Sequence, residues 1–91
     1  MYLYLNNDFG IFVEDIVGIF DLDTSTGGSR ITSGYLADAQ ARGDIVNTAG
    51  YEIPRSFIVL KDGRVYLSAI NAVTLEKRAK EITSQGGNYG R

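Results

Sequence analysis

The chain has 91 residues, a mass of 9.9 kDa and a net charge of -2, with 44% hydrophobic and 22% charged residues. This length and balance are those of one ordinary globular domain rather than of a disordered chain. Cysteine and histidine are both absent, which excludes a disulfide framework, a zinc site of Cys/His type, a cysteine nucleophile and a Ser-His-Asp relay.

The small net charge conceals two halves of opposite sign. Residues 1–54 hold eight acidic and two basic side chains, which gives -6, whereas residues 55–91 hold seven basic and three acidic ones, which gives +4. A local basic surface attracts an anionic partner such as nucleic acid even when the total charge is negative. The alternative is that the two halves pair with each other, within one chain or between subunits.

The first elements predicted along the chain are three strands. Apolar and aromatic residues at 2–5 and 9–13 flank Asn6-Asn7-Asp8, residues that tolerate left-handed backbone, so a hairpin is predicted. A third strand is predicted at 16–22 from its β-branched and aromatic content. Within it Gly18 indicates a bulge or a close approach of another group to the backbone.

The middle of the chain predicts a helix and a second hairpin. Ser29 can cap a helix that runs to about Arg42 and stops at Gly43. Residues 45–46 are too short to identify as a strand. Strands at 56–60 and 64–70 give the strongest local signal, a hairpin whose turn, Lys61-Asp62-Gly63, depends on glycine.

A second helix is predicted near the C-terminus. Asn71 is its expected cap, and apolar residues recur at helical spacing from Ala72 to about Ile82. Residues 85–91 are expected to form a flexible tail because they are polar and rich in glycine. We therefore predict a single α+β domain at 1–84, with two helices and a small, mostly antiparallel sheet of four to five short strands.

The apolar pattern of the predicted sheet indicates self-association. The strand at 56–60 is apolar on both sides of its pleat, and residues 65–70 are nearly so. Two helices can cover one face of such a sheet, so another surface must cover the other. A second subunit is the economical answer. The alternative is that the strands curl into a small barrel-like sheet around their own core.

No metal or cofactor site is predicted. The loop from Asp21 to Gly27 places oxygens at alternate positions as a calcium loop does, but Thr26 and Thr32 stand where glycine and glutamate are needed. Gly27-Gly28-Ser29 lack the lysine of a phosphate-binding loop, so a turn into the helix is expected.

No catalytic set converges either, so we expect neither an enzyme nor a small-molecule substrate. No apolar run approaches the length of a membrane span, and the N-terminus lacks a basic segment followed by an apolar core, so a cytoplasmic protein is expected.

The candidate binding residues are basic. Arg55 follows Pro54, which restricts the residue before it to extended geometry and stiffens the approach to the apolar strand. With Lys61 and Arg64 on the following hairpin, Arg55 could present its guanidinium to phosphates or to guanine edges. The alternative is that these bases form ion pairs with Glu52 and Asp62.

Four segments carry a resemblance to a known family. They are Met1-Tyr2-Leu3-Tyr4-Leu5, Asp15-Ile16-Val17-Gly18-Ile19-Phe20-Asp21, Pro54-Arg55-Ser56 and Thr74-Leu75-Glu76-Lys77-Arg78-Ala79. Together they resemble the bacterial extracellular-matrix regulators of the RemA/RemB family, in particular the RemB branch, over nearly residues 1–82. The resemblance implies a ring-forming transcriptional regulator of biofilm matrix genes that binds DNA through arginines on its rim.

The resemblance extends to only some of the DNA-contacting arginines of the family. Arg55 matches the last arginine of an arginine-rich segment in the RemA branch, and Arg30 falls on a basic position. Glu52 and Ile53 correspond to the preceding arginines of that segment, and Asp15 corresponds to another DNA-contacting arginine. Acidic side chains at such positions repel phosphates.

Two functional hypotheses therefore stand side by side. The first is a homo-oligomeric, ring-like DNA-binding regulator of matrix genes, with a basic rim formed by Arg55, Arg64, Lys61 and Arg30. The second is an oligomeric regulatory scaffold that binds a protein partner and does not contact DNA. The feature that separates them is whether the basic residues share one surface or are neutralised by acids of the first half.

Overall fold

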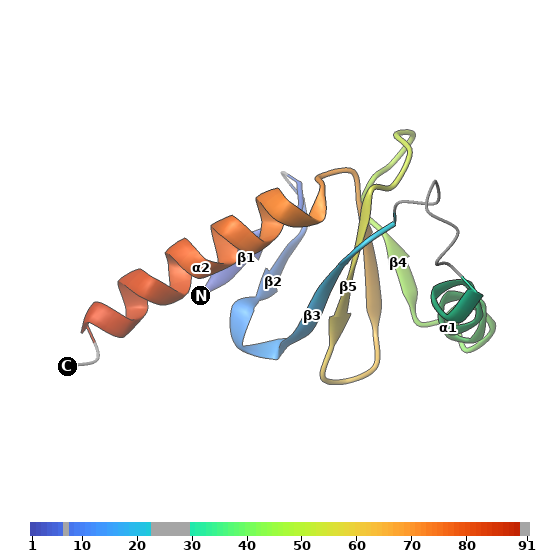
Figure 1. The fold of residues 1–91 in the computed structure, drawn as a ribbon, viewed down its shortest axis with the longest axis horizontal. Helices are drawn as coiled ribbons and strands as arrows, with labels where there is room; N and C mark the ends of the chain where they lie inside the picture. The colour runs from blue at the N-terminus through green and yellow to red at the C-terminus, as the bar shows by residue number, and fades with distance from the viewer. Residues whose placement is uncertain (7, 23–29, 90–91) are drawn as a thin grey trace.

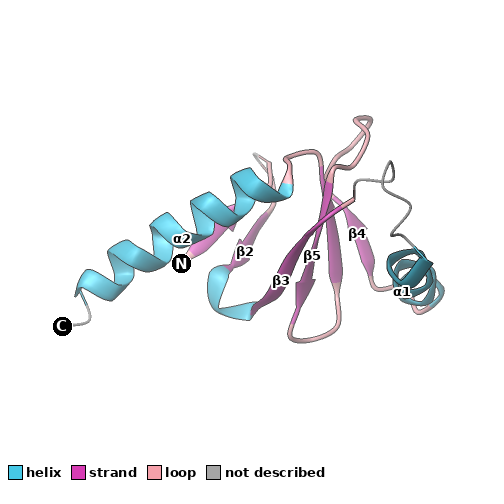
Figure 2. Cartoon of the chain, viewed as in Figure 1, coloured by secondary structure: helices cyan, strands magenta, loops and turns pink. Residues whose placement is uncertain are grey.

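The computed structural model describes residues 1–6, 8–22 and 30–89. In chain order the elements are β1 (Tyr2–Tyr4), β2 (Gly10–Phe12), a 3₁₀ turn (Val13–Asp15), β3 (Ile16–Asp21), α1 (Arg30–Ala41), β4 (Ile45–Asn47), β5 (Ser56–Leu60), β6 (Val65–Ser68) and α2 (Ala72–Tyr89). Figures 1 and 2 show the two helices on opposite sides of a central sheet. The architecture is α+β, as predicted.

The central sheet has the strand order β3-β5-β6-β4, and β1 and β2 form a separate two-stranded hairpin. The β3–β5 and β5–β6 ladders are antiparallel, whereas β4 pairs parallel to β6. The predicted, mostly antiparallel sheet is confirmed. The sheet is open, with β3 and β4 as its two edges, so the strands do not curl into a barrel.

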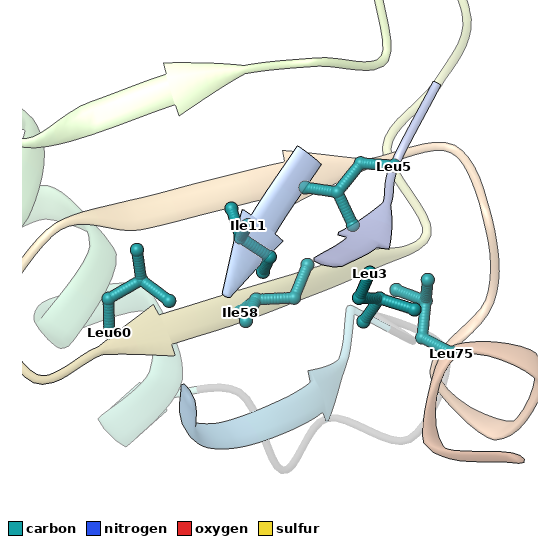
Figure 3. Close-up of a cluster of buried hydrophobic side chains, with 6 residues drawn as sticks. All are labelled: Leu3, Leu5, Ile11, Ile58, Leu60 and Leu75. Atoms are coloured by element: carbon teal, nitrogen blue, oxygen red, sulfur yellow. The ribbon is translucent and has the colours of Figure 1, made fainter. Parts of the chain in front are cut away.

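One face of the sheet is covered by the β1–β2 hairpin and α2. Leu3, Leu5 and Ile11 of the hairpin and Leu75 of α2 meet Ile58 and Leu60 of β5 in one buried cluster (Figure 3). Ile58 and Leu75 are completely buried. Side chains at alternate strand positions share a face, so the spacing of Leu3 and Leu5 and of Ile58 and Leu60 produces this packing.

On the opposite face, α1 packs over part of the sheet. Ala39 of α1 packs against Phe57 of β5 and Val65 of β6, and Leu36 joins the same cluster. The expectation that both helices cover one face is therefore wrong, because the hairpin and α2 share one face and α1 takes the other. Phe20 of β3, which stacks on Phe57, stays 46% exposed, so α1 covers only part of this face. Self-association stays a prediction.

Several local predictions are confirmed by hydrogen bonds and dihedral angles. The side chain of Asn6 accepts bonds from the N–H groups of Asp8 and Phe9, at 2.7 and 2.8 Å, and closes the first hairpin. Asn71 caps α2 by accepting a 2.8 Å bond from the N–H of Thr74. Gly63 has φ 91°, the left-handed geometry that its turn requires.

The end of α2 differs from the one predicted. The backbone of α2 stays helical to Tyr89, whereas the sequence predicted an end near Ile82 and a tail from residue 85. Glycine lowers helix propensity without forbidding helical dihedrals, so Gly86 and Gly87 do not end the helix. The expected cap of α1, Ser29, lies outside the described residues.

Candidate nucleic-acid interface

Arg55 lies at the beginning of the central strand β5, where its backbone is held on both sides. Its N–H donates to the carbonyl of Ser68 at 2.8 Å, and its own carbonyl accepts from the N–H of Leu22 at 2.9 Å. The side chain is exposed, and within the described residues no carboxylate forms an ion pair with it. The expected alternative, pairing of the three bases with Glu52 and Asp62, is therefore not formed by Arg55, although Arg64 does pair with Asp62.

The loop before Arg55 adds two exposed apolar side chains. Tyr51 is fully exposed and Ile53 is 84% exposed. The loop begins at a fixed point, because the side chain of Asn47 accepts a 2.9 Å bond from the N–H of Ala49. Sequence reasoning did not single out Tyr51 or Ile53. Their alternation with Arg55 in a stretch stiffened by proline is the signal that could have identified them.

Lys61 and Arg64 lie at the opposite end of the sheet from Arg55. Lys61 follows the last residue of β5, six residues after Arg55, which corresponds to roughly 20 Å along an extended strand. Figure 1 shows the β5–β6 turn at the far end of the strand from the loop that precedes β5. A single chain therefore does not bring Arg55 together with the other two predicted bases.

Arg64 is also neutralised by a neighbour. Its Nε lies 3.0 Å from the carboxylate of Asp62, and its backbone N–H donates to the same side chain at 3.0 Å. Arg42 forms a similar pair with Asp44, at 2.9 Å, and this hydrogen bond raises the pKa of the Arg42 guanidinium. Both arginines are thus engaged with an acid two residues away.

Acidic residues surround Lys61. Its backbone N–H donates to the carbonyl of Asp15 at 2.9 Å, which places the Glu14-Asp15 turn beside it. A hydrogen bond from its own backbone N–H and the N-terminal ammonium hold the pKa of Glu14 below its ordinary value, and Lys61 acts in the same direction. This end of the sheet carries charges of both signs and is not a basic surface.

The remaining bases lie on the helices. Arg30 is the first residue of α1, and its side chain is outside the described part of the structure. On α2, Lys77, Arg78 and Lys80 are exposed and lie among two glutamates, Glu76 and Glu81. None of these three bases forms an ion pair with the side chains described.

The structure offers no metal centre in the described ranges, where no three acidic side chains gather closely enough to hold an ion. Most of the Asp21-to-Gly27 loop lies outside those ranges, so the exclusion of calcium there stays a prediction. Neither described helix is long and apolar enough to cross a membrane.

Comparison with known proteins identifies relatives. A family described as RemA-like, extracellular matrix regulatory protein A-like, matches residues 3–79. Extracellular matrix regulatory protein B of Bacillus subtilis (strain 168) is 32% identical over 80 residues, which covers 88% of this chain and 91% of the relative. The family match spans the central sheet, the hairpin and the first turns of α2.

Proposed function

The chain belongs to the RemA-like family of extracellular matrix regulatory proteins, and from this premise we propose that it is a non-enzymatic, homo-oligomeric regulator that contacts DNA through Arg55. The family consists of regulatory proteins, and the names of its members state that they regulate the extracellular matrix. Binding of DNA, regulation of transcription and assembly into a ring are the parts that we propose.

The single observation that supports DNA contact is the state of Arg55. Its backbone is pinned between Leu22 and Ser68, while its guanidinium is exposed and unpaired among the described side chains. A guanidinium held in this way can reach a phosphate without first breaking an ion pair. Arg64 and Arg42 lack that property because each is paired with an aspartate.

One phosphate contact per chain is too weak for stable binding, so oligomerisation is part of the proposal. Each neutralised phosphate contributes about 0.9 to the slope of log affinity against log salt, and several contacts are needed for useful affinity. An assembly that repeats Arg55 along one surface supplies them by raising the effective concentration of each further contact. A chain with net charge -2 can then still bind DNA.

The scaffold alternative has its own supporting observation. Tyr51 and Ile53 flank Glu52 in the loop before Arg55 and are largely or fully exposed. An exposed aromatic residue and an exposed isoleucine beside an arginine are typical of protein contacts. If this loop binds a protein, Arg55 serves that contact rather than a phosphate.

A DNA titration over a series of salt concentrations tests the proposal. Arg55→Ala should weaken binding to duplexes of any sequence and lower the salt slope by about one unit for each phosphate that is no longer neutralised. Arg64→Ala is the matched control, because its guanidinium is already paired with Asp62; it should leave affinity and slope close to wild type.

A charge-restoring variant sharpens the test. Glu52→Arg removes a carboxylate three residues before Arg55 and should tighten binding, because phosphates are then no longer repelled from the loop. If wild type does not bind DNA at low salt and Glu52→Arg gains no binding, the DNA proposal fails and the scaffold alternative takes its place.

A further inference from the structure

Two buried serines face each other on β5 and β6, next to Arg55. Ser56 and Ser68 are directly paired in the β5–β6 ladder, and both are completely buried. On the same face of β5, the positions that alternate with Ser56 are Ile58 and Leu60 of the apolar core. A hydroxyl buried in such surroundings costs free energy unless it forms hydrogen bonds. We call Ser56 and Ser68 the serine pair.

Both hydroxyls of the serine pair bind the backbone of one residue, Ile70. The Ser56 hydroxyl donates to the Ile70 carbonyl at 2.6 Å, and the Ser68 hydroxyl accepts from the Ile70 N–H at 3.0 Å. Ile70 lies in the connection between β6 and α2, past the end of the backbone ladder. The serine pair therefore clamps this connection onto the sheet through side chains.

The clamped end of β6 supplies the hydrogen-bond acceptor for Arg55. The N–H of Arg55 donates to the carbonyl of Ser68 at 2.8 Å. The residue before Arg55 is Pro54, which has no N–H and cannot continue the ladder. Strand ends open readily unless other contacts hold them. The position of the Ser68 carbonyl, and with it the position of the Arg55 backbone, thus depends on the serine pair.

A third buried hydroxyl lies nearby and has no such connection to Arg55. Thr48 is 6% exposed, and its hydroxyl donates to the carbonyl of Leu67 at 2.6 Å. The same carbonyl accepts the N–H of Thr48 at 2.9 Å, so it stays paired when the hydroxyl is removed. Thr48 therefore offers a matched control, with a bond as short as that of Ser56 but outside the clamp on Ile70.

We infer that Ser56 and Ser68 are positioning residues for the proposed DNA contact, because their hydroxyls hold the end of β6 against which the Arg55 backbone is fixed. This inference rests on the proposed function, since the serine pair affects DNA binding only through Arg55. Neither serine touches DNA itself, because both are completely buried. A contact residue whose backbone is already fixed loses less conformational entropy on binding, and affinity rises accordingly.

A double-mutant cycle with Arg55→Ala tests the inference by DNA titration at low salt, where weak complexes stay measurable. Ser56→Ala should weaken binding roughly fivefold or more and should have no further effect when Arg55→Ala is also present. Ser68→Ala should behave in the same way. Thr48→Val should leave the affinity close to wild type in both backgrounds. A purely structural role would weaken binding equally with and without Arg55.

Amide hydrogen exchange measured by NMR tests the geometry without DNA. The N–H of Arg55 should exchange faster in Ser56→Ala and in Ser68→Ala than in wild type. The slowest core amides report global unfolding and provide the reference, so a local effect at Arg55 is separated from a general loss of stability. Thr48→Val should leave the exchange of the Arg55 N–H unchanged relative to that reference.

The inference is overturned if Ser56→Ala and Ser68→Ala bind DNA as wild type does, or if they weaken binding equally in the Arg55→Ala background. It is also overturned if circular dichroism shows that neither variant folds, because the serine pair then serves the fold alone. Failure of the proposed function is a different result, in which wild type itself does not bind DNA at low salt. That result would refute both the DNA contact and the role of the serine pair in it.

Discussion

Because the Phe20 ring contacts Gly18, the effect of Gly18→Ala on the free energy of unfolding depends on whether Phe20 is present. The two residues share one face of β3, and the Phe20 ring lies over the Gly18 backbone and stacks on Phe57 at a centroid distance of 5.1 Å. A Cβ at Gly18 would lie 2.6 and 2.7 Å from two carbons of the Phe20 ring. Gly18→Ala therefore forces this ring to move and disturbs its stacking on Phe57.

The magnitude follows from two opposing contributions. Alanine in place of glycine inside a strand gains about 0.5 to 1 kcal/mol from backbone entropy. Two effects oppose this gain. Disrupted stacking of Phe20 on Phe57 costs about 0.5 to 1.5 kcal/mol, and each Å² of apolar surface exposed on Phe57 costs about 25 cal/mol. The entropy and stacking contributions nearly cancel, so the uncovered surface sets the sign, and we expect Gly18→Ala to destabilise the protein by less than about 1 kcal/mol. In a Phe20→Ala background the clash is absent, so the same change should stabilise by about 0.5 kcal/mol.

Urea unfolding at one fixed protein concentration measures this reversal of sign, since association would otherwise shift the midpoints. Gly34→Ala on α1 is the control, because a Cβ there has nothing within 4 Å; it should stabilise by about 1 kcal/mol in either background. If Gly18→Ala has the same effect with and without Phe20, the ring does not occupy the space over Gly18 and the reasoning is refuted.

Two further predictions concern a helix cap and an exposed carboxylate. Asn71→Ala removes the bond to the N–H of Thr74 and should cost about 1 kcal/mol in thermal unfolding, whereas Asn71→Asp should retain most of the stability. The folded-state pKa of Glu14 is lowered, so its contribution to stability is complete above the unfolded-state value of about 4.3 and is lost as pH falls through the folded pKa. An NMR titration of the Glu14 carboxyl at or above that value would contradict this prediction.

Local signals made most of the secondary structure predictable. Asn6, Gly63 and Asn71 act within a few residues of themselves, through a side-chain bond or a left-handed φ, so their turns and cap are readable without the fold. Gly18 was expected at a bulge or a close approach, and both occur: the ladder shifts register between Ile16 and Gly18, and the Phe20 ring approaches the backbone. The parallel strand β4 was not recognised, because three residues carry too little periodicity.

The way in which the hairpin and the helices cover the central sheet could not be predicted from the apolar pattern of the sequence. The apolar strand 56–60 correctly indicated burial on both faces, but the sequence did not show that the first hairpin folds over one face as a layer of its own. A two-stranded hairpin and a sheet-edge strand have the same alternation of apolar and polar residues. Self-association therefore does not follow from a wholly uncovered face of the central sheet, and it stays a prediction.

The candidate site was predictable only in part. Arg55 and Lys61 flank one predicted strand, so their separation at opposite ends follows from the strand prediction itself once its length is considered. The ion pair of Arg64 with Asp62 was one of the two alternatives left open by the sequence, and it forms across the turn that Gly63 permits. The alternation of Tyr51 and Ile53 with Arg55 points to one shared side of the loop, and the structure adds that this side is exposed.

The position of β5 in the chain sets the order in which the protein can fold during synthesis. Leu3, Leu5 and Ile11 are made first, yet the strand on which they pack, with Ile58 and Leu60, comes after more than half of the chain. Leu75, which closes the same cluster, comes later still. Until these residues leave the ribosome, the early hairpin is a two-stranded ribbon, which is marginally stable at best in water. The domain therefore folds after synthesis of its last helix has begun, and the early apolar strands stay accessible to chaperones until then.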